Sequence, residues 1–334
     1  MTATFLPGRV SLLAASHQFP EQHLSNGELL GALEQLSGKR FARVAARIVP
    51  FLGIEGRHFS RSIQIHTSEP NPSNSDLAVH TIKDLLANSQ HTLSDIDYLI
   101  GHTTTPDTQL PPNIAWVAEK LDTKVRLWNC DKLVQVSQVL YKSPFRALLC
   151  STNPSPSWVA KQGQCTFDYD KGFLDQSQLV NYMQMGDGAG GVIIGPETSE
   201  GIGTISHCFT GQIGIDKSPG LSLDGGSASV YTQAGKARFH HSATDVRKSG
   251  EALFQASILA LREQGFELDD FDYIIPHQAS GRIDSMLAEA LDIDSNKIVN
   301  DAKHWGNLGS AAIWCSFSNL VRSDKLGREV RSLF

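Results

Sequence analysis

Several features that define common protein classes are scarce in this sequence of 334 residues. It has only five cysteines, neither closely paired nor spaced as metal ligands, at positions 130, 150, 165, 208 and 315. The histidines do not cluster with ligand spacing either, so we expect no metal centre. No apolar run approaches the length that spans a bilayer, and the N-terminus lacks a charged segment followed by an apolar signal core. These absences predict a reduced, cytoplasmic protein that does not enter a membrane.

An excess of positive charge is missing as well. The chain has 29 Lys and Arg against 35 Asp and Glu, which gives a net charge of -6. Nucleic acids bind where Lys and Arg are concentrated, so we expect no nucleic-acid partner. No Gly-x-Ser-x-Gly elbow precedes a helical stretch, which argues against a serine hydrolase. The composition is otherwise that of an ordinary globular protein, long enough for two domains or one large α/β unit.

The chain contains an internal repeat. Residues 94–105 align without a gap with residues 269–280, and His102 falls on His277. Each copy has an acidic loop, a buried strand and a histidine where the strand ends, and an amphipathic helical stretch precedes it. A repeat of helix, strand and helix predicts one fold made of two similar halves. The helical stretches are 76–88 and 250–264, and we place the halves at 1–200 and 201–334.

Apolar runs and turn residues predict the remaining elements. We expect a helix from near Gly27, with Ser25 or Asn26 as its cap, and another that Pro111 and Pro112 begin and that runs to Leu121. The glycines of residues 185–194 precede an apolar strand instead of a helix, which favours close backbone packing over a nucleotide loop. Further strands are predicted at 10–15, 98–100, 125–128 and 145–150, helices at 37–49 and 131–141, a turn at 53–58, and irregular chain at 151–181 and 211–249.

One predicted helix is strongly basic. It carries Lys39, Arg40, Arg43 and Arg47. A charged run of this kind is usually a solvated helix face. The alternative is a patch that meets a phosphate-bearing substrate or an acidic carrier protein.

Three residues carry the chemistry of the candidate site. Cys130 lies between a predicted strand and a predicted helix, where helix N–H groups favour thiolate over thiol. His277 follows the strand of the second copy, and Asn307 follows Gly306 about thirty residues later. A lone histidine is more often structural, and a Gly-Asn pair is usually a turn. Their combination with a thiol in the other half indicates a catalytic site.

With these motifs the chain resembles the thiolase superfamily, and within it the β-ketoacyl-acyl carrier protein synthase III-like enzymes. The resemblance covers most of the chain, and the order and spacing of its motifs are specific. It implies a thiolase-like fold of two pseudo-symmetric halves in a layered αβαβα sandwich. The motifs are Phe19-Pro-Glu21 with Ser25-Asn26, Gly53-Ile54 with Arg57, Thr103-Thr-Thr-Pro-Asp107, Gly186-Asp-Gly-Ala189, Pro276-His277-Gln-Ala279, and Gly306-Asn307 with Ser310-Ala-Ala312.

The resemblance also implies roles for the candidate residues. His277 and Asn307 match the histidine and asparagine that hold the thioester carbonyl and the carbanion formed when a malonyl group loses carbon dioxide. Cys130 matches the nucleophile by position and would carry the acyl group. Cys150 is the alternative thiol, although its strand-like surroundings favour a packed side chain. His304 is expected to be a packing or loop histidine, and His102 a structural residue or a wall of the pocket.

The function implied is acyl transfer from a coenzyme A or acyl-carrier-protein thioester, with no tightly bound cofactor. A malonyl-type acceptor gives carbon–carbon bond formation, and a hydroxyl or amine acceptor gives simple acyl transfer. The alternative is a catalytically inactive subunit that completes a related partner enzyme. The adenine-stacking Trp of the family is absent from residues 30–50, so thioester use is implied more directly than coenzyme A binding. We expect a homodimer, because the resemblance implies one and the implied fold has a long sheet edge to cover.

Overall fold

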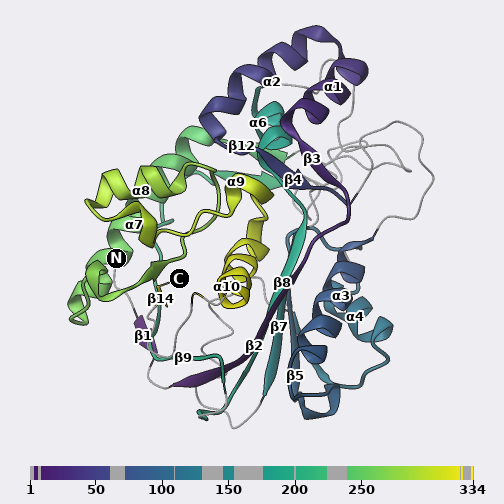
Figure 1. Cartoon of the computed structure of the whole chain (residues 1–334), viewed down its shortest axis with the longest axis vertical. Coiled ribbons are helices and arrows are strands. Elements are labelled where there is room, and N and C mark those ends of the chain that lie inside the picture. The colour runs from purple at the N-terminus through teal and green to yellow at the C-terminus, as the bar shows by residue number, and fades with distance from the viewer. Residues whose placement is uncertain are drawn as a thin grey trace.

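The structure is a computed structural model of the chain. Figure 1 shows a central sheet with helices packed on both sides, which confirms the predicted layered α/β fold. The residues described are 4–6, 9–60, 72–108, 110–129, 146–153, 176–198, 201–223, 239–323, 325 and 332–333.

The central sheet has six strands in the order β6-β5-β7-β8-β2-β9. β5 runs parallel to β6 and β7, whereas β8 is antiparallel to its neighbours β7 and β2. The four strands predicted from apolar runs are therefore confirmed, with shifted ends. The strands are β2 (Val10–Gln18), β5 (Tyr98–His102), β6 (Arg126–Asn129), β7 (Ala147–Asn153), β8 (Gly188–Gly195) and β9 (Gly203–Ile205).

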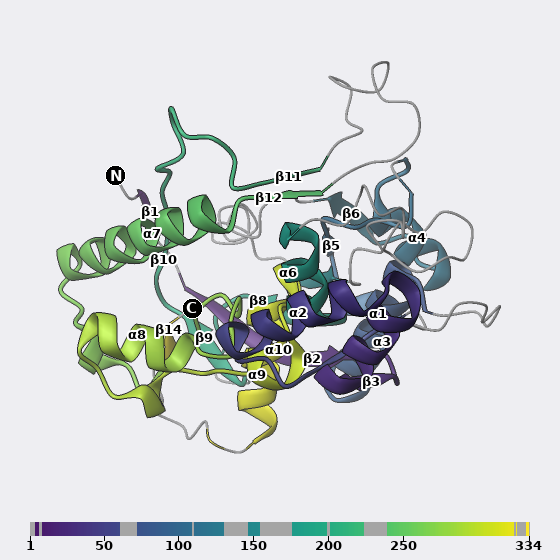
Figure 2. The ribbon, with the colours of Figure 1, turned by 90° about the horizontal axis from the view of Figure 1, so that it is seen from above.

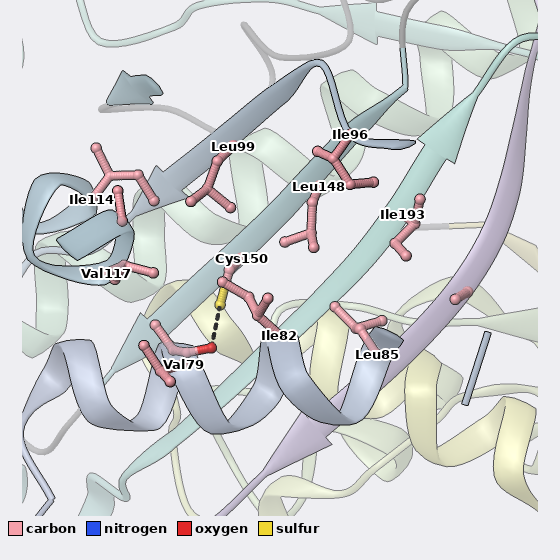
Figure 3. Close-up of a cluster of buried hydrophobic side chains, with 13 residues drawn as sticks. Val79, Ile82, Leu85, Ile96, Leu99, Ile114, Val117, Leu148, Cys150 and Ile193 are labelled. Carbon is pink, nitrogen blue, oxygen red and sulfur yellow. Dashed lines mark hydrogen bonds between the residues drawn. The ribbon is translucent and has the colours of Figure 1, made fainter. Parts of the chain in front are cut away.

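The middle of the sheet is buried on both faces, as β7 illustrates. Leu148 and Cys150 pack against helices α3 and α4, in the cluster drawn in Figure 3. Ala147 and Leu149 point to the other face, where they pack against helix α10. A strand covered on both sides is apolar throughout, and each fully buried leucine contributes about 1.5–3 kcal/mol. The helices are α3 (Asn74–Ala87), α4 (Asn113–Lys120) and α10 (Ala312–Arg322).

The glycines predicted to precede a buried strand lie largely within it. β8 begins at Gly188 and is buried along its whole length. A Cβ atom on Gly190 would come within 2.8 Å of the Cys315 amide nitrogen, and one on Gly191 within 2.8 Å of the Leu149 carbonyl oxygen. These glycines therefore allow α10 and β7 to approach the strand closely, as close backbone packing requires.

A helical cluster stands at one end of the sheet in Figure 1. Helix α1 begins with a capping box, in which Ser25 and Glu28 exchange side-chain and backbone hydrogen bonds. Leu29 and Leu33 of α1 pack against Leu179 and Met183 of α6. The elements are α1 (Asn26–Ser37), α2 (Lys39–Leu52), α6 (Gln176–Gln184), and the antiparallel pair β3 (His23–Ser25) and β4 (Gly56–His58).

Two sequence predictions are wrong in this region. The stretch 53–58 is not only a turn, because Gly56–His58 forms strand β4 against the distant β3. The irregular stretch 151–181 contains the start of helix α6. In both places the element is completed by packing partners far away in the sequence. The helix predicted at 131–141 lies outside the described residues.

The internal repeat is confirmed, element by element. A helix, a short 3-10 helix, a strand and a second helix follow one another in both copies. Asp122 and Asp292 follow the last helix of each copy with left-handed φ angles of 48° and 54°. The copies are α3, η1 (Leu93–Asp95), β5 and α4, and then α7 (Ala243–Glu263), η2 (Leu268–Asp270), β13 (Tyr273–Ile274) and α8 (Ile283–Leu291).

The second copy lies beyond α10, on the side away from α3 and α4, in both Figure 1 and Figure 2. Strand β14 (Ser332–Leu333) pairs with β13 in parallel, as β7 pairs with β5. The division near residue 200 stays a prediction, and β9, which follows it, pairs with β2.

The remaining elements are short. Helix α7 begins at Ala243, and two antiparallel strands precede it, so the stretch 211–249 is less irregular than predicted. Within the described ranges, no helix is long and apolar enough to cross a membrane. The short elements are β1 (Thr4–Leu6) paired with β10 (Cys208–Thr210), β11 (Leu221–Leu223) paired with β12 (Phe239–His241), η3 (Ser295–Lys297), α9 (Ala302–Trp305) and η4 (Gly309–Ala311).

Candidate active site

His277 lies on the loop that follows strand β13. Its neighbours Pro276 and Gln278 are buried, whereas the side chain of His277 is exposed. The surrounding protein nevertheless desolvates the imidazole and lowers its pKa below the usual value of 6.5. The exposure and the lowered pKa are both explained if the imidazole lies deep in the protein and no other side chain covers it. At neutral pH the imidazole is therefore uncharged, with one N–H to donate.

Gln278 fastens this loop to a second one. Its Nε2 donates to the carbonyl oxygens of Pro276 at 2.8 Å and Val299 at 3.0 Å. Its Oε1 accepts from the backbone N–H groups of Asp301 at 2.9 Å and Ala302 at 3.2 Å. The amide thus uses both donors and both acceptor positions, and only 1% of the residue is exposed.

One short helix, α9, begins at Ala302 and lies just before Asn307. Helix α9 ends at Trp305, and the φ of 71° and ψ of -171° of the following Gly306 lie in a region that only glycine adopts without strain. The side-chain Oδ1 of Asn307 accepts from the Gly309 N–H at 2.9 Å. Because an N–H can only donate, this bond fixes the amide orientation and leaves Nδ2 as the outward donor. No residue of the described ranges accepts from that Nδ2.

Gln184, at the end of α6, touches both loops. Its Nε2 donates to the Ala279 carbonyl oxygen at 2.5 Å, and its own carbonyl accepts from the Asn307 N–H at 2.8 Å. Asn300 adds another link, because its Nδ2 donates to the Gly281 carbonyl at 2.8 Å. The loops that carry His277 and Asn307 are therefore brought together by a shared set of hydrogen bonds.

Close glycine packing and a buried arginine support this arrangement. A Cβ on Gly186 would lie 2.1 Å from the Trp305 carbonyl oxygen, so no side chain fits there. The fully buried Arg57 donates to the Asn26 Oδ1 at 2.8 Å and to the Met183 carbonyl at 2.6 Å. Burial lowers the pKa of Arg57 to about 10, so it remains charged at neutral pH.

The predicted nucleophile, Cys130, lies outside the described residues. The preceding residue, Asn129, ends β6 at the edge of the central sheet. A small pocket near this strand end is lined by Asn129, His102 and Cys150 among others, and it has room for about one water molecule. His102 thus lines this small pocket, and its role as a structural residue or a wall of the catalytic pocket stays a prediction.

The alternative thiol, Cys150, is a packing residue. Its sulfur lies in the apolar cluster of Figure 3, where the thiol donates to the Ala78 carbonyl oxygen at 3.9 Å. Burial raises the pKa of the Cys150 thiol to about 12. A thiol that stays protonated at neutral pH is a poor nucleophile. His304 was predicted to be a packing or loop histidine, but it is an exposed residue of the short helix α9, and its ring lies 3.9 Å from the Glu55 carboxylate.

Sequence reasoning missed the residues that hold the site together. Gln278 stands inside a quoted motif, but nothing local to it reveals the bonds to residues 299–302. Gln184 was missed with its helix, although Leu179, Tyr182 and Met183 have the spacing of one helix face. That spacing was the signal available in the sequence.

Comparisons with known proteins agree with this architecture. Residues 261–334 match the family described as 3-oxoacyl-[acyl-carrier-protein (ACP)] synthase III C terminal. The chain is 29% identical over 276 residues to the β-ketoacyl-[acyl-carrier-protein] synthase III of Rickettsia felis, a match that covers 79% of this chain and 80% of the relative.

Two solved structures share the fold. The 3-oxoacyl-(acyl carrier protein) synthase III of Pseudomonas aeruginosa superimposes with a TM-score of 0.73 at 21% identity, over 97% of this chain and 92% of the other. A tetronic acid condensing enzyme gives a TM-score of 0.76 at 22% identity, with 97% and 94% covered. The fold and these matches define a thiolase-fold, acyl-transferring condensing enzyme. Within that class the sequence is similar to the β-ketoacyl-acyl carrier protein synthase III enzymes, through the family match over residues 261–334 and the Rickettsia felis relative over 79% of the chain.

Proposed function

We propose that the protein condenses an acyl group, carried from a thioester on Cys130, with a malonyl-type acceptor. The observation that carries the proposal is the pair of hydrogen-bond donors, the His277 ring and the Asn307 Nδ2, on two loops joined by Gln278 and Gln184. Two donors fixed in advance can stabilise negative charge that develops on one thioester oxygen.

The first half-reaction is acyl transfer to sulfur. The Cys130 thiolate attacks the carbonyl carbon of the incoming thioester, a new carbon–sulfur bond forms, and the carrier thiol leaves as its thiolate and takes up a proton. The product is an acyl-cysteine, which divides one difficult step into two easier ones.

The second half-reaction requires the two donors. The carbon–carboxylate bond of the malonyl thioester breaks, carbon dioxide leaves, and the electron pair moves into the thioester carbonyl as an enolate. His277 and Asn307 donate to that oxygen, and each well-placed donor is worth about 3 kcal/mol. The enolate carbon then attacks the acyl-cysteine, and the Cys130 thiolate is released. A neutral His277 suits this role, because it donates without needing to be charged.

The basic face of α2 supports the proposal that the thioester substrate has a negatively charged carrier. Arg40, Arg43 and Arg47 are spaced to share one face of the helix, and all three are exposed. In the described part of the chain none of them has a carboxylate partner. The end of α2 meets the histidine loop, where Gly281 N–H and Ser280 Oγ both donate to the Leu52 carbonyl. Positive charge that leads to the site can attract phosphate groups or an acyl carrier protein.

The descriptions of related proteins name two kinds of thioester carrier, coenzyme A and acyl carrier protein. One, of OleA from Xanthomonas campestris, is described with bound lauric acid and lauroyl-CoA, at 15% identity and a TM-score of 0.72. The relatives named synthase III carry the acyl carrier protein in their names. We therefore include acyl-CoA and acyl carrier protein as donor substrates, with no tightly bound cofactor.

A homodimer completes the proposal. β6 is an edge strand that pairs only with β5 within the described ranges, and Leu127 on it is 44% exposed. An open, partly apolar strand edge is a surface that proteins normally cover. Light scattering should therefore give twice the mass of the 36.4 kDa chain, and Leu127→Asp should give a monomer. A wild-type monomer would contradict this part of the proposal.

The test of the activity separates its two steps. The protein is incubated with acyl-CoA and acyl carrier protein thioesters, and its intact mass reports the adduct on Cys130. Malonyl thioester is then added, and the release of carbon dioxide is measured. We expect an adduct in the wild type that Cys130→Ala abolishes, followed by carbon dioxide release.

The other outcomes identify the alternatives. Loss of the adduct to a hydroxyl or amine acceptor without carbon dioxide would indicate simple acyl transfer. An adduct that survives in Cys130→Ala would exclude the assigned nucleophile. Absence of any adduct would indicate the catalytically inactive subunit.

A further inference from the structure

We propose that Gln278 is a positioning residue that fixes the histidine loop relative to the asparagine loop, and so sets the distance between the two donors. The proposal rests on the proposed function, which assigns those donors to His277 and Asn307. It goes further in naming the side chain that makes them act on one oxygen atom.

The first argument is connectivity. On one side, Gln278 binds the carbonyl of Pro276, the residue directly before His277. On the other, it binds the N–H groups of Asp301 and Ala302, where α9 begins. Helix α9 is four residues long and is followed directly by Gly306 and Asn307. One rigid amide therefore controls the backbone on both approaches to the site.

The second argument is chemical. Two of the four groups that Gln278 binds are carbonyl acceptors, and two are N–H donors. Only a primary amide has two N–H donors beside an acceptor oxygen at the end of a side chain of this length. A carboxylate could keep the bonds to Asp301 and Ala302, but it would face the Pro276 and Val299 carbonyls without a proton. A protonated Glu would recover one of those bonds.

The third argument is electrostatic. Gln278 is buried beside His277, whose pKa burial lowers. A neutral amide leaves that imidazole uncharged, whereas a carboxylate would favour its protonated form. The choice of an amide thus serves both the geometry and the charge of the site.

The test uses two variants at this position and one matched control. Gln278→Glu keeps the shape and changes the hydrogen-bonding pattern, and Gln278→Met removes all four bonds. Gln255→Glu makes the same chemical change on an exposed position of α7. Acylation of Cys130 and release of carbon dioxide are measured separately between pH 5.5 and 8.5, together with thermal unfolding.

We expect both Gln278 variants to form the acyl-cysteine at rates within about threefold of wild type at pH 8, and to release carbon dioxide about a hundredfold more slowly. Only Gln278→Glu should recover as the pH falls, because its carboxyl group regains a proton and donates again. The control should match wild type in both steps. A purely structural role would instead lower both half-reactions and the melting temperature together, without recovery at low pH.

Several results would overturn the assignment. They are an unchanged rate of carbon dioxide release, an equal loss in both half-reactions, or the failure of both variants to fold, which would make the residue a requirement of the fold alone. A wild type that releases no carbon dioxide would contradict the proposed function instead. The positioning claim would then be tested by NMR, where Gln278→Met should shift both the His277 ring and the Asn307 side-chain amide, and Gln255→Glu neither. A shift confined to His277 would contradict it.

Discussion

The two copies of the repeat place a histidine at the same point and surround it differently. In the first copy, His102 ends a five-residue strand that lies between β6 and β7 in the sheet, and its Nδ1 lies 3.5 Å from the Ser151 hydroxyl. In the second, strand β13 has two residues, and His277 follows it on an irregular loop with its ring uncovered. The duplicated backbone thus places a histidine after a strand in each copy, and the chain around it determines whether the imidazole is covered or exposed.

The anchors of the two loops differ in charge. In the first copy, the Asp107 carboxylate accepts from the Asn74 N–H at 2.9 Å and from the Ser73 hydroxyl at 3.0 Å, at the start of α3. In the second copy, the neutral Gln278 holds the backbone at the start of α9. A carboxylate is the stronger anchor, but next to His277 it would raise the pKa of the imidazole. The site therefore has the weaker, uncharged anchor where the charge of the histidine matters.

The most direct way to break the comparison is to remove each histidine. His277→Ala should lower the rate of carbon dioxide release by about 10²–10³-fold, as expected when one donor to a developing oxyanion is lost. His102→Ala should stay within a few-fold of wild type, because that ring lines a pocket and contacts Ser151. Equal losses in the two variants would show that the copies are functionally equivalent.

The pH dependence of unfolding tests His17, whose side chain lies between strand β2 and helix α10. His17 on β2 lies 3.0 Å from the Ser318 hydroxyl of α10, beside the ion pair that joins Arg322 to Asp84 of α3. Burial, and next the Arg322 charge, lower the pKa of His17 to about 4. The unfolded chain binds a proton near pH 6.5 and the folded chain only near pH 4, so stability is complete above pH 6.5 and falls between those values.

The expected loss is about 3 kcal/mol of unfolding free energy between pH 6.5 and 4. His17→Gln should remove that part of the pH dependence, since its amide can still bond to Ser318 and does not titrate. His207→Gln, on an exposed histidine, should leave the pH dependence as it is. Denaturant unfolding at several pH values measures both, and identical profiles for wild type and His17→Gln would exclude this source of acid sensitivity.

Two glycines of the second half test its backbone. Gly306→Ala should lower the unfolding free energy by about 1–3 kcal/mol, because φ is +71° and the new Cβ would lie 2.9 Å from the Gln184 carbonyl oxygen. Gly250→Ala, in the middle of α7 with open space around it, should raise stability by about 0.5–1 kcal/mol. Thermal unfolding distinguishes them, and a stabilising Gly306→Ala would mean that the turn before Asn307 is not constrained.

The smallest effect is expected at the first-copy anchor. Asp107→Asn should cost about 1 kcal/mol of stability, since an amide oxygen replaces the charged acceptor at the start of α3. Carbon dioxide release should not change, because this loop lies in the first copy. Asp269→Asn, whose ion pair with Lys297 is largely exposed, is the control and should change stability by less. A slower release of carbon dioxide by folded Asp107→Asn would link the first loop to the catalytic site.

Much of the fold was predictable, because its signals are local. The Ser25 cap marked the start of α1, and the gapless alignment of His102 with His277 revealed the repeat. Strand β4 was missed because three residues, Gly56–His58, become a strand only through pairing with β3. The two donors of the site could be named from a resemblance, but their connection could not. That connection runs through Gln184 and Gln278, and the most distant partner, Asn307, lies 123 residues after Gln184.

The position of Gln184 has a consequence for how such a molecule could arise. It belongs to the predicted first half, yet its carbonyl and its amide hold loops of the second. If both halves descend from one shorter gene product, that ancestor could have formed this contact only between two separate molecules. Fusion into one polypeptide would have replaced their concentration-dependent encounter with a tethered one, at an effective concentration on the order of millimolar. The covalent link would then keep the site assembled even when the protein is rare.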